Sequence, residues 1–355
     1  MADARALAEA LGRAAANMPP TTVMEVCGTH TQSVARYALR QLLPPNLRLI
    51  SGPGCPVCVT DDGDIARALW LTRQPGVTLL SFGDMLRVPG SGGDSLLRAR
   101  ERGADVRLAT SPMDALRVAR AEPGHQIVWL AVGFETTAPL TAALLARARA
   151  DDVRNLTVLC AHKTMPSALL ALLRGNRRVQ ALLCPGHVAA ITGAEAFRFV
   201  PNALYLPAVV AGFTPTNILA ALLEIVRMRV AGVAELRNAY PSAVTARGNR
   251  TAQALLAEVF APCSARWRGL GVIDDSGLAL RPAFADFDAL ARFAPPLPAP
   301  AAPGTACRCA DILRGECRPA ECPLFGKACT PDGPAGPCMV SAEGACASAY
   351  LYGGL

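Results

Sequence analysis

The sequence of 355 residues has few aromatic residues, no block of like charge and no long apolar run that is free of helix-breaking residues. Aromatic residues make up 5% of the chain and apolar residues 52%, so a large core must be mainly aliphatic. The net charge of +7 is spread along the chain and lacks the basic and aromatic clustering that marks a nucleic-acid surface. Nucleic-acid binding is therefore not expected.

Export signals and membrane segments are not expected either. The first twenty residues indicate a short amphipathic helix and lack the apolar h-region of a signal peptide. The most apolar stretch, residues 203–226, is interrupted by prolines and polar residues, which favours a buried strand followed by a helix. We expect a cytoplasmic protein with no membrane partner. Thirteen cysteines in such a protein indicate metal or thiol chemistry more often than structural disulfides.

Eight β-rich runs alternate with helical patterns over the first two thirds of the chain. They are TTVMEVCG, NLRLISG, VTLLSFGD, DVRLAT, QIVWLAVGF, LTVLCAHK, VQALLCPGH and LYLPAVVAGF. Continuous apolar strands that alternate with helices are typical of an α/β fold with parallel sheets. The spacing fits either one eight-stranded βα barrel or two doubly wound domains, and favours two domains slightly. The stretch AEPGHQ, residues 121–126, lies midway and could join two halves.

The alternation fades after residue 233, and a Pro/Ala-rich linker at residues 294–306 leads into a cysteine-rich tail. The tail has few apolar residues, so a cross-link is expected to hold it together. Four thiolates around an iron–sulfur cluster are the first expectation, zinc the second and disulfides the third. Its seven cysteines are Cys307, Cys309, Cys317, Cys322, Cys329, Cys338 and Cys346.

Two cysteine motifs follow the first two predicted strands, CGTHT at residues 27–31 and GPGCPVC at residues 52–58. Cys27 and His30 are separated by two residues, so both can face one metal. If a helix begins near Cys58, the sulfurs of Cys55 and Cys58 lie by its N-terminus, where thiol pKa values fall. Such a pair suits dithiol and disulfide chemistry. All four residues also make a plausible zinc set, and spacing alone leaves the zinc and redox interpretations nearly even.

Polar residues follow three later strands. Glu135 lies in GFETTAP, residues 133–139, and is expected to be exposed at a strand end. His162 and Lys163 follow the next strand, and His187 lies in PGH after the one beyond. Ligands bind at the carboxyl ends of strands in α/β folds, so these side chains are expected to line one wall of a cleft.

Together these motifs resemble the HypD family of hydrogenase maturation factors over nearly the whole chain. The stretches that carry the resemblance are CGTHT, GPGCPVC, GFETTAP, PGH, CPLFGKACTP and GPCMVSAEGAC. The family builds the Fe(CN)2CO group of NiFe hydrogenases. It acts with a small partner, HypC, as the scaffold on which iron receives cyanide delivered by HypE. The resemblance therefore implies a maturation scaffold with redox activity, rather than a conventional turnover enzyme.

The resemblance also implies two similar α/β domains around a cleft, and a third domain that carries a 4Fe–4S cluster. The expected boundaries are residues 20–120, 121–232 and 233–355. The two remaining hypotheses are a zinc-binding α/β enzyme and a cluster-linked thiol–disulfide oxidoreductase.

The roles of individual residues follow from the same resemblance. Cys27 is expected to bind the transient Fe(CN)2CO iron with His30 beside it, and Cys55 and Cys58 to form the redox pair. The expected cluster ligands are Cys322, Cys329, Cys338 and Cys346. Because the tail has more thiols than ligand positions, Cys309 or Cys317 could replace one of them. The candidate catalytic residues are Cys27, His30, Cys55, Cys58, Glu135 and His187.

Overall fold

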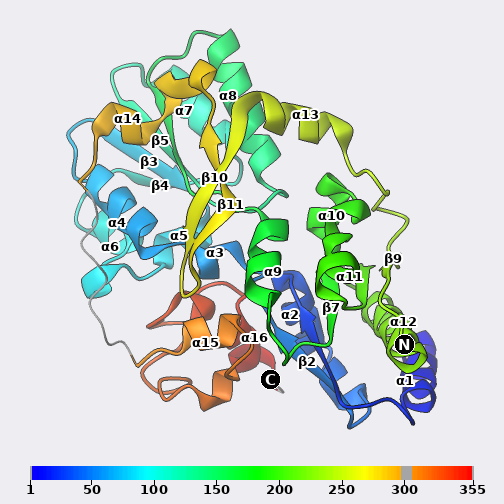
Figure 1. Cartoon of the computed structure of the whole chain (residues 1–355). Helices are drawn as coiled ribbons and strands as arrows, with labels where there is room; N and C mark the ends of the chain where they lie inside the picture. Colours follow the sequence, from blue (N-terminus) through cyan, green and yellow to red (C-terminus); the bar gives the residue numbers. More distant parts are fainter. Residues whose placement is uncertain (1, 297–305, 354–355) are drawn as a thin grey trace.

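The fold is α/β, with two separate parallel sheets (Figure 1). The structure is a computed structural model that describes residues 2–296 and 306–353, so most of the expected linker lies outside the described residues. All eight β-rich runs predicted from the sequence form strands. The α/β prediction is confirmed, and the single-barrel alternative is wrong because the strands divide between two open sheets.

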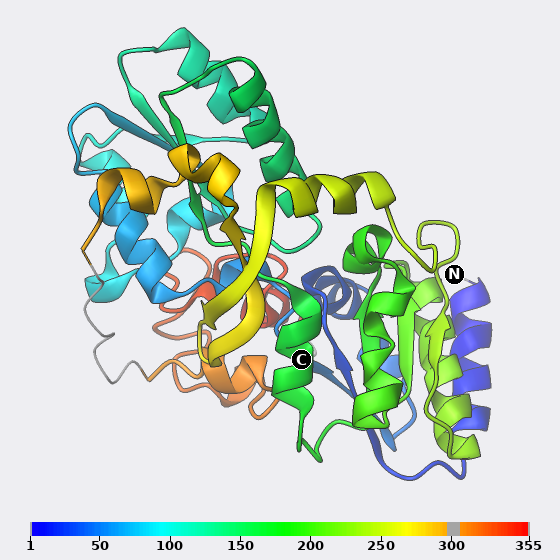
Figure 2. The same ribbon diagram turned by 45° about the horizontal axis from the view of Figure 1, so that its top comes forward.

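The five-stranded sheet has the order β2-β1-β7-β8-β9, with every pair parallel. Its strands are β1 (Thr21–Glu25), β2 (Leu47–Ser51), β7 (Ala181–Pro185), β8 (Ala208–Ala211) and β9 (Leu236–Asn238). Helices α1 (Ala2–Ala14) and α12 (Pro215–Ala231) contact each other and share one hydrophobic cluster with this sheet. Figures 1 and 2 show the two helices side by side at the outer face of the molecule.

The four-stranded sheet has the order β4-β3-β5-β6 and is also parallel. Its strands are β3 (Val77–Ser81), β4 (Val106–Leu108), β5 (Gln126–Ala131) and β6 (Leu156–Cys160). Successive residues of β5 face opposite sides. Val128 and Leu130 join one hydrophobic cluster while Ile127 and Trp129 join another, as expected for a strand covered on both faces.

Helices cover both faces of this sheet. Helices α7 (Met113–Ala121) and α8 (Ala138–Ala150) pack on the Trp129 side, and α4 (Asp62–Leu71) and α6 (Leu96–Glu101) pack on the other. The remaining α-helices are α2 (Gly28–Arg36), α3 (Pro56–Val59), α5 (Gly83–Arg87), α9 (Met165–Leu173), α10 (Gly186–Thr192), α11 (Phe199–Leu204), α13 (Arg250–Val259), α14 (Ala289–Phe293), α15 (Cys309–Leu313) and α16 (Ala345–Tyr352). In the part of the chain that the structure describes, no helix is both long and apolar enough to cross a bilayer.

The sheets do not follow the boundary expected near residue 121. Strands β1 and β2 pair with β7, β8 and β9, although the whole four-stranded sheet lies between them in the sequence. The stretch at residues 121–126 connects α7 to β5 within the four-stranded sheet and does not join two halves. Spacing could not reveal this, because parallel strands need no sequence neighbour as partner.

A β-hairpin that the sequence reasoning missed connects the parts of the molecule. Strands β10 (Phe260–Trp267) and β11 (Gly271–Leu280) form an antiparallel pair, which Figures 1 and 2 show running toward the tail. At its tip, the Trp267 ring stacks on Phe134 with centroids 5.9 Å apart. The backbone N–H of Arg268 donates to Val59 at 3.0 Å, and Arg314 of the tail donates to the Gly269 carbonyl at 2.7 Å.

The turn after β5 requires glycine at position 133. Gly133 has φ +150°, and a Cβ there would lie 1.6 Å from Oγ1 and 2.8 Å from Cβ of Thr137. Because a Cβ–Cβ distance of 2.8 Å cannot be relieved by hydroxyl rotation alone, the turn itself must shift. Gly133→Ala should therefore lower the free energy of unfolding in urea by about 1 to 3 kcal/mol.

Gly124→Ala is the matched control, since no atom lies within 4 Å of a Cβ at that position. Its unfolding free energy should stay within about 0.5 kcal/mol of the parent value. Equal effects of the two substitutions would contradict the steric argument.

Candidate thiol and metal centre

The two cysteine motifs lie together because β1 and β2 are parallel neighbours in register. Glu25 at the end of β1 pairs with Ser51 at the end of β2, so both following loops leave the same edge of the sheet. The loops contact closely, with the Gly28 N–H donating to the Gly54 carbonyl at 3.0 Å. A Cβ at Gly54 would lie 2.4 Å from the Cys27 nitrogen. GPGCPVC thus needs glycine at this position to pass against the Cys27 backbone.

Cys55 and Cys58 are both buried, and their side chains are hydrogen-bonded to each other. Cys55 is the N-cap residue of α3, which begins at Pro56 and is four residues long. The expectation of a helix beginning near Cys58 is therefore confirmed, since Pro56 occupies the first helical position and both cysteines lie by the N-terminus of α3.

A series of thiols continues from this pair into the tail. Cys58 forms a side-chain hydrogen bond with Cys338, and its Sγ lies 3.9 Å from the Pro337 carbonyl oxygen. The Sγ of Cys338 lies 2.8 Å from that of Cys309 and is also within hydrogen-bonding reach of Cys346. Burial raises the pKa of Cys58, but the hydrogen bonds from Cys338 and Cys55 outweigh it and leave that pKa below its ordinary value.

The tail encloses a small cavity lined mainly by sulfur. Five thiols face it, namely Cys307, Cys322, Cys329, Cys338 and Cys346. The four expected cluster ligands are all among them. Cys309 contacts the group through Cys338, whereas Cys317 lines a different cavity between the tail and β2. The sequence reasoning considered Cys309 and Cys317 as substitutes and overlooked Cys307.

The thiol spacing does not match a single zinc ion. Zn–S bonds of about 2.3 Å in a tetrahedron place sulfur atoms about 3.8 Å apart. Among the described residues, only Asp105, Glu122 and His125 form a group of three ligand atoms within 4.8 Å of one another. Both carboxylates of that group are bound by Arg107. Cys27, His30, Cys55 and Cys58 therefore do not assemble the zinc set that their spacing allowed.

Glu343 of the tail is a site residue that the sequence reasoning missed. Its Oε1 accepts a hydrogen bond of 2.6 Å from the Thr29 hydroxyl, and a Cβ at Gly28 would lie 2.5 Å from its Cβ. Burial, followed by the negative charge of Glu343, raises the pKa of Cys27 to about 12. The available signal was its place in the GPCMVSAEGAC stretch, between Cys338 and Cys346.

His30 and His187 both contact the aromatic ring of Phe213. The His187 and Phe213 rings stack with centroids 3.9 Å apart, and the His30 ring lies 4.7 Å from Phe213. Burial lowers the pKa of His30 to about 4, so its ring is neutral at physiological pH. Its Nε2 is 3.0 Å from the Gly212 carbonyl, which can only accept. The proton therefore sits on Nε2, and the buried Nδ1 has a free lone pair without a partner among the described residues.

Glu135 is buried, so its expected exposure is wrong. Its Oε1 accepts a hydrogen bond of 2.9 Å from the Met165 N–H. This bond holds the buried carboxylate against the segment that follows β6. Its Oε2 has no partner in the described chain, and burial raises the Glu135 pKa to about 7.

The expected single wall of polar strand ends is also incorrect. His162 bonds to the Thr141 hydroxyl at 3.0 Å and Lys163 to Asp64 at 3.4 Å, both at the four-stranded sheet. His187 instead follows β7 in the five-stranded sheet. The ends of β5 and β6 share one edge because these strands are parallel neighbours, whereas β7 belongs to the other sheet.

Known proteins of one family match this chain over nearly its full length. A family model named HypD, described as "Hydrogenase formation hypA family", matches residues 2–353. The hydrogenase maturation factor HypD of Rhizobium leguminosarum bv. viciae is 46% identical over 338 residues, covering 93% of this chain and 88% of the relative. The corresponding factor of Azotobacter vinelandii is 45% identical, covering 99% and 94%. That of Escherichia coli (strain K12) is 43% identical, covering 94% and 89%. The chain therefore belongs to the HypD family of hydrogenase maturation factors.

Proposed function

We propose that this protein is a scaffold on which the Fe(CN)2CO group of NiFe hydrogenase is assembled. The observation that carries the proposal is the series of buried thiols that runs from the Cys55–Cys58 pair through Cys338 to the tail cavity, next to the Cys27 loop. A HypC-type small chaperone and a HypE-type cyanide donor are its proposed partners. A reducing cytoplasmic compartment belongs to the same proposal, because it keeps thirteen cysteines free.

Cys27 is the proposed ligand for the iron that is the cargo of this reaction. Its thiol must lose a proton before it binds metal, and its raised pKa means that the proton is present at neutral pH. Iron binding must therefore displace that proton. Glu343, held by Thr29, and the free Nδ1 of His30 are acceptors in the same region.

The tail cavity suits a 4Fe–4S cluster as the resident cofactor. Cysteine thiolates are the usual ligands of such clusters, and five thiols line this cavity. Cys322, Cys329, Cys338 and Cys346 are the proposed ligands. When bound, such a cluster supplies or accepts single electrons. Cys338 would then bind the cluster and contact Cys58 at the same time.

Cys55 and Cys58 form the proposed redox pair. Joining their sulfurs in a disulfide releases two electrons and two protons, and reduction takes up the same number. The lowered pKa of Cys58 favours its thiolate, which is the nucleophilic form. The hydrogen bond that Cys338 donates to Cys58 gives the pair a direct contact with the tail.

A domain division based on the sheets accompanies this proposal. Two α/β domains would surround the five-stranded and four-stranded sheets, with the cysteine motifs in a cleft between them and the tail. A third, iron–sulfur domain would comprise the tail. The chain passes from one sheet to the other after β2 and again after β6, so these domains would not divide at residue 121.

A thiol–disulfide oxidoreductase without an iron cargo is the second candidate, and the Cys58–Cys338 contact favours it equally. The two functions differ in the need for Cys27. A redox relay alone gives no reason for a thiol at this position, or for the Glu343 carboxylate beside it. The zinc-enzyme hypothesis is disfavoured by the thiol spacing.

Replacement of Cys27 separates these functions. After anaerobic purification from cells that make the partners, Cys27→Ala should show no infrared bands of bound cyanide and carbonyl, because the iron has lost its thiolate. The visible absorbance of the cluster should remain. Cys263→Ala is the control, since Cys263 lies in β10 outside the thiol series. Bands that persist in Cys27→Ala would refute the assigned role.

Iron and acid-labile sulfide analysis tests the cluster ligands. Cys329→Ala and Cys346→Ala should each lose most of the bound iron and sulfide, because each removes a thiol from the cavity. Cys317→Ala should keep both at the parent level, since its side chain lines a different cavity. Loss in Cys317→Ala with retention in Cys329→Ala would reverse the assignment.

Co-purification tests the proposed partnership. A tagged form of this chain should retain a small protein with an N-terminal cysteine, and Cys27→Ala should retain less of it if both cysteines hold the same iron. Infrared spectra of the isolated complex provide the second readout. Cyanide bands in this chain purified without any small partner would contradict a shared iron site.

A further inference from the structure

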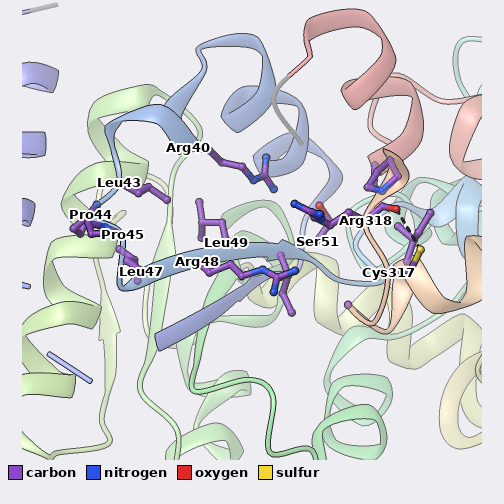
Figure 3. A pocket seen from close by; sticks show the side chains of 15 residues that line it. Arg40, Leu43, Pro44, Pro45, Leu47, Arg48, Leu49, Ser51, Cys317 and Arg318 are labelled. Carbon is purple, nitrogen blue, oxygen red and sulfur yellow. Dashed lines mark hydrogen bonds between the residues drawn. The ribbon is translucent and has the colours of Figure 1, made fainter. Parts of the chain in front are cut away.

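A cavity of about 420 Å³ lies between β2 and the tail, separate from the thiol series. Arg40, Arg48 and Arg318 are among the residues that line it, so we call it the arginine cavity. Figure 3 shows Arg40 and Arg48 extending toward Ser51 and Arg318. The three arginines come from separate segments of the chain, namely the 3-10 helix before β2, β2 itself and the tail.

The positive charge in the arginine cavity is only partly balanced. Arg40 is paired with Glu25 at 3.6 Å and Arg318 with Glu321 at 2.9 Å, so three guanidinium groups meet two carboxylates. The Arg40 side chain is 19% exposed, and its Nη1 has no hydrogen-bond partner among the described residues. Because that Nη1 has no accessible surface, an anion in the cavity would meet Arg40 through its other donors and would meet the exposed guanidinium groups of Arg48 and Arg318.

The rest of the lining suits an organic molecule. Leu43, Pro44 and Leu47 form an apolar side next to the arginines (Figure 3). The volume falls within the range of small-molecule sites, and an apolar wall with a few convergent polar groups is their usual lining. A bare inorganic ion would leave this apolar side without a contact.

We propose that the arginine cavity binds a small organic phosphate monoester. Its phosphate would contact Arg40, Arg48 and Arg318, and its organic part would pack on Leu43 and Pro44. Guanidinium groups bind phosphate and carboxylate with paired hydrogen bonds. A carboxylate has two oxygens in one plane, whereas a phosphate monoester has three terminal oxygens in a tetrahedral arrangement and carries nearly two charges. Three arginines that arrive from different segments fit the tetrahedral dianion better.

Such a ligand would join the tail to the five-stranded sheet. Ile312 of α15 lines both the arginine cavity and the cysteine cavity, so the two sites share a wall. Arg318 belongs to the tail and Arg48 to β2, and a phosphate held by both would hold these segments together. Binding should therefore stabilise the docked position of the tail.

Isothermal titration calorimetry on the full-length protein tests this inference, with adenosine monophosphate, inorganic phosphate, adenosine and citrate as probes. We expect saturable binding of adenosine monophosphate, weaker binding of phosphate and none of adenosine. Arg48→Ala and Arg318→Ala should each weaken binding of adenosine monophosphate more than tenfold. Arg48→Lys, which keeps the charge and loses the paired hydrogen bonds, should lie between parent and Arg48→Ala.

Arg36→Ala is the matched control, because Arg36 is an exposed arginine of α2 that does not line the cavity. It should bind adenosine monophosphate as the parent does, and circular dichroism should show all variants folded. Failure of both phosphate compounds to bind the parent would overturn the proposal. Binding of citrate without phosphate would overturn the choice of anion. Unchanged affinity in Arg48→Ala and Arg318→Ala would overturn the choice of site.

Discussion

The close passage of Gly54 over the Cys27 backbone is the contact on which the rest of the site depends. It follows from the parallel register of β1 and β2, which end at the same edge of the sheet. Because no side chain separates the two loops, Cys55 and Cys58 lie in the same small volume as the Cys27 loop. The tail then closes this volume, with Glu343 against Gly28 and Cys338 against Cys58. A bulkier residue at either glycine would separate the thiols before any chemistry could begin.

Burial also determines the chemical state of the site. The thiol of Cys27 and the imidazole of His30 are each shifted toward their neutral forms because water is excluded from them. Cys58 is the exception, since neighbouring thiols donate to it and stabilise its thiolate. Cys27 and Cys58 are both buried cysteines, so the opposite directions of their pKa shifts come from the hydrogen bonds to Cys58.

The elements were predictable from the sequence, but their partners were not. Continuous apolar runs such as QIVWLAV specify a strand covered on both faces, and all eight predicted strands are present. Sheet membership depends on which edge each strand reaches after a long crossover, and no local pattern encodes that. The hairpin was missed because β10 has alternating exposed residues within a short segment of mixed composition. At the site, the motifs identified the cysteines, whereas the burial of Glu135 and the place of His187 depend on tertiary packing.

The interrupted five-stranded sheet has a consequence for synthesis on the ribosome. The backbone of Thr22 is bonded to the side chain of Gln180, 158 residues later, and β1 cannot pair with β7 before that strand has been made. The four-stranded sheet is continuous in sequence and can form before β7 is available to pair with β1. Non-local pairings of this kind form late and leave intermediates with unpaired strand edges. Cys27, Cys55 and Cys58 are therefore open to solvent through much of translation, and are enclosed only when the C-terminal tail arrives.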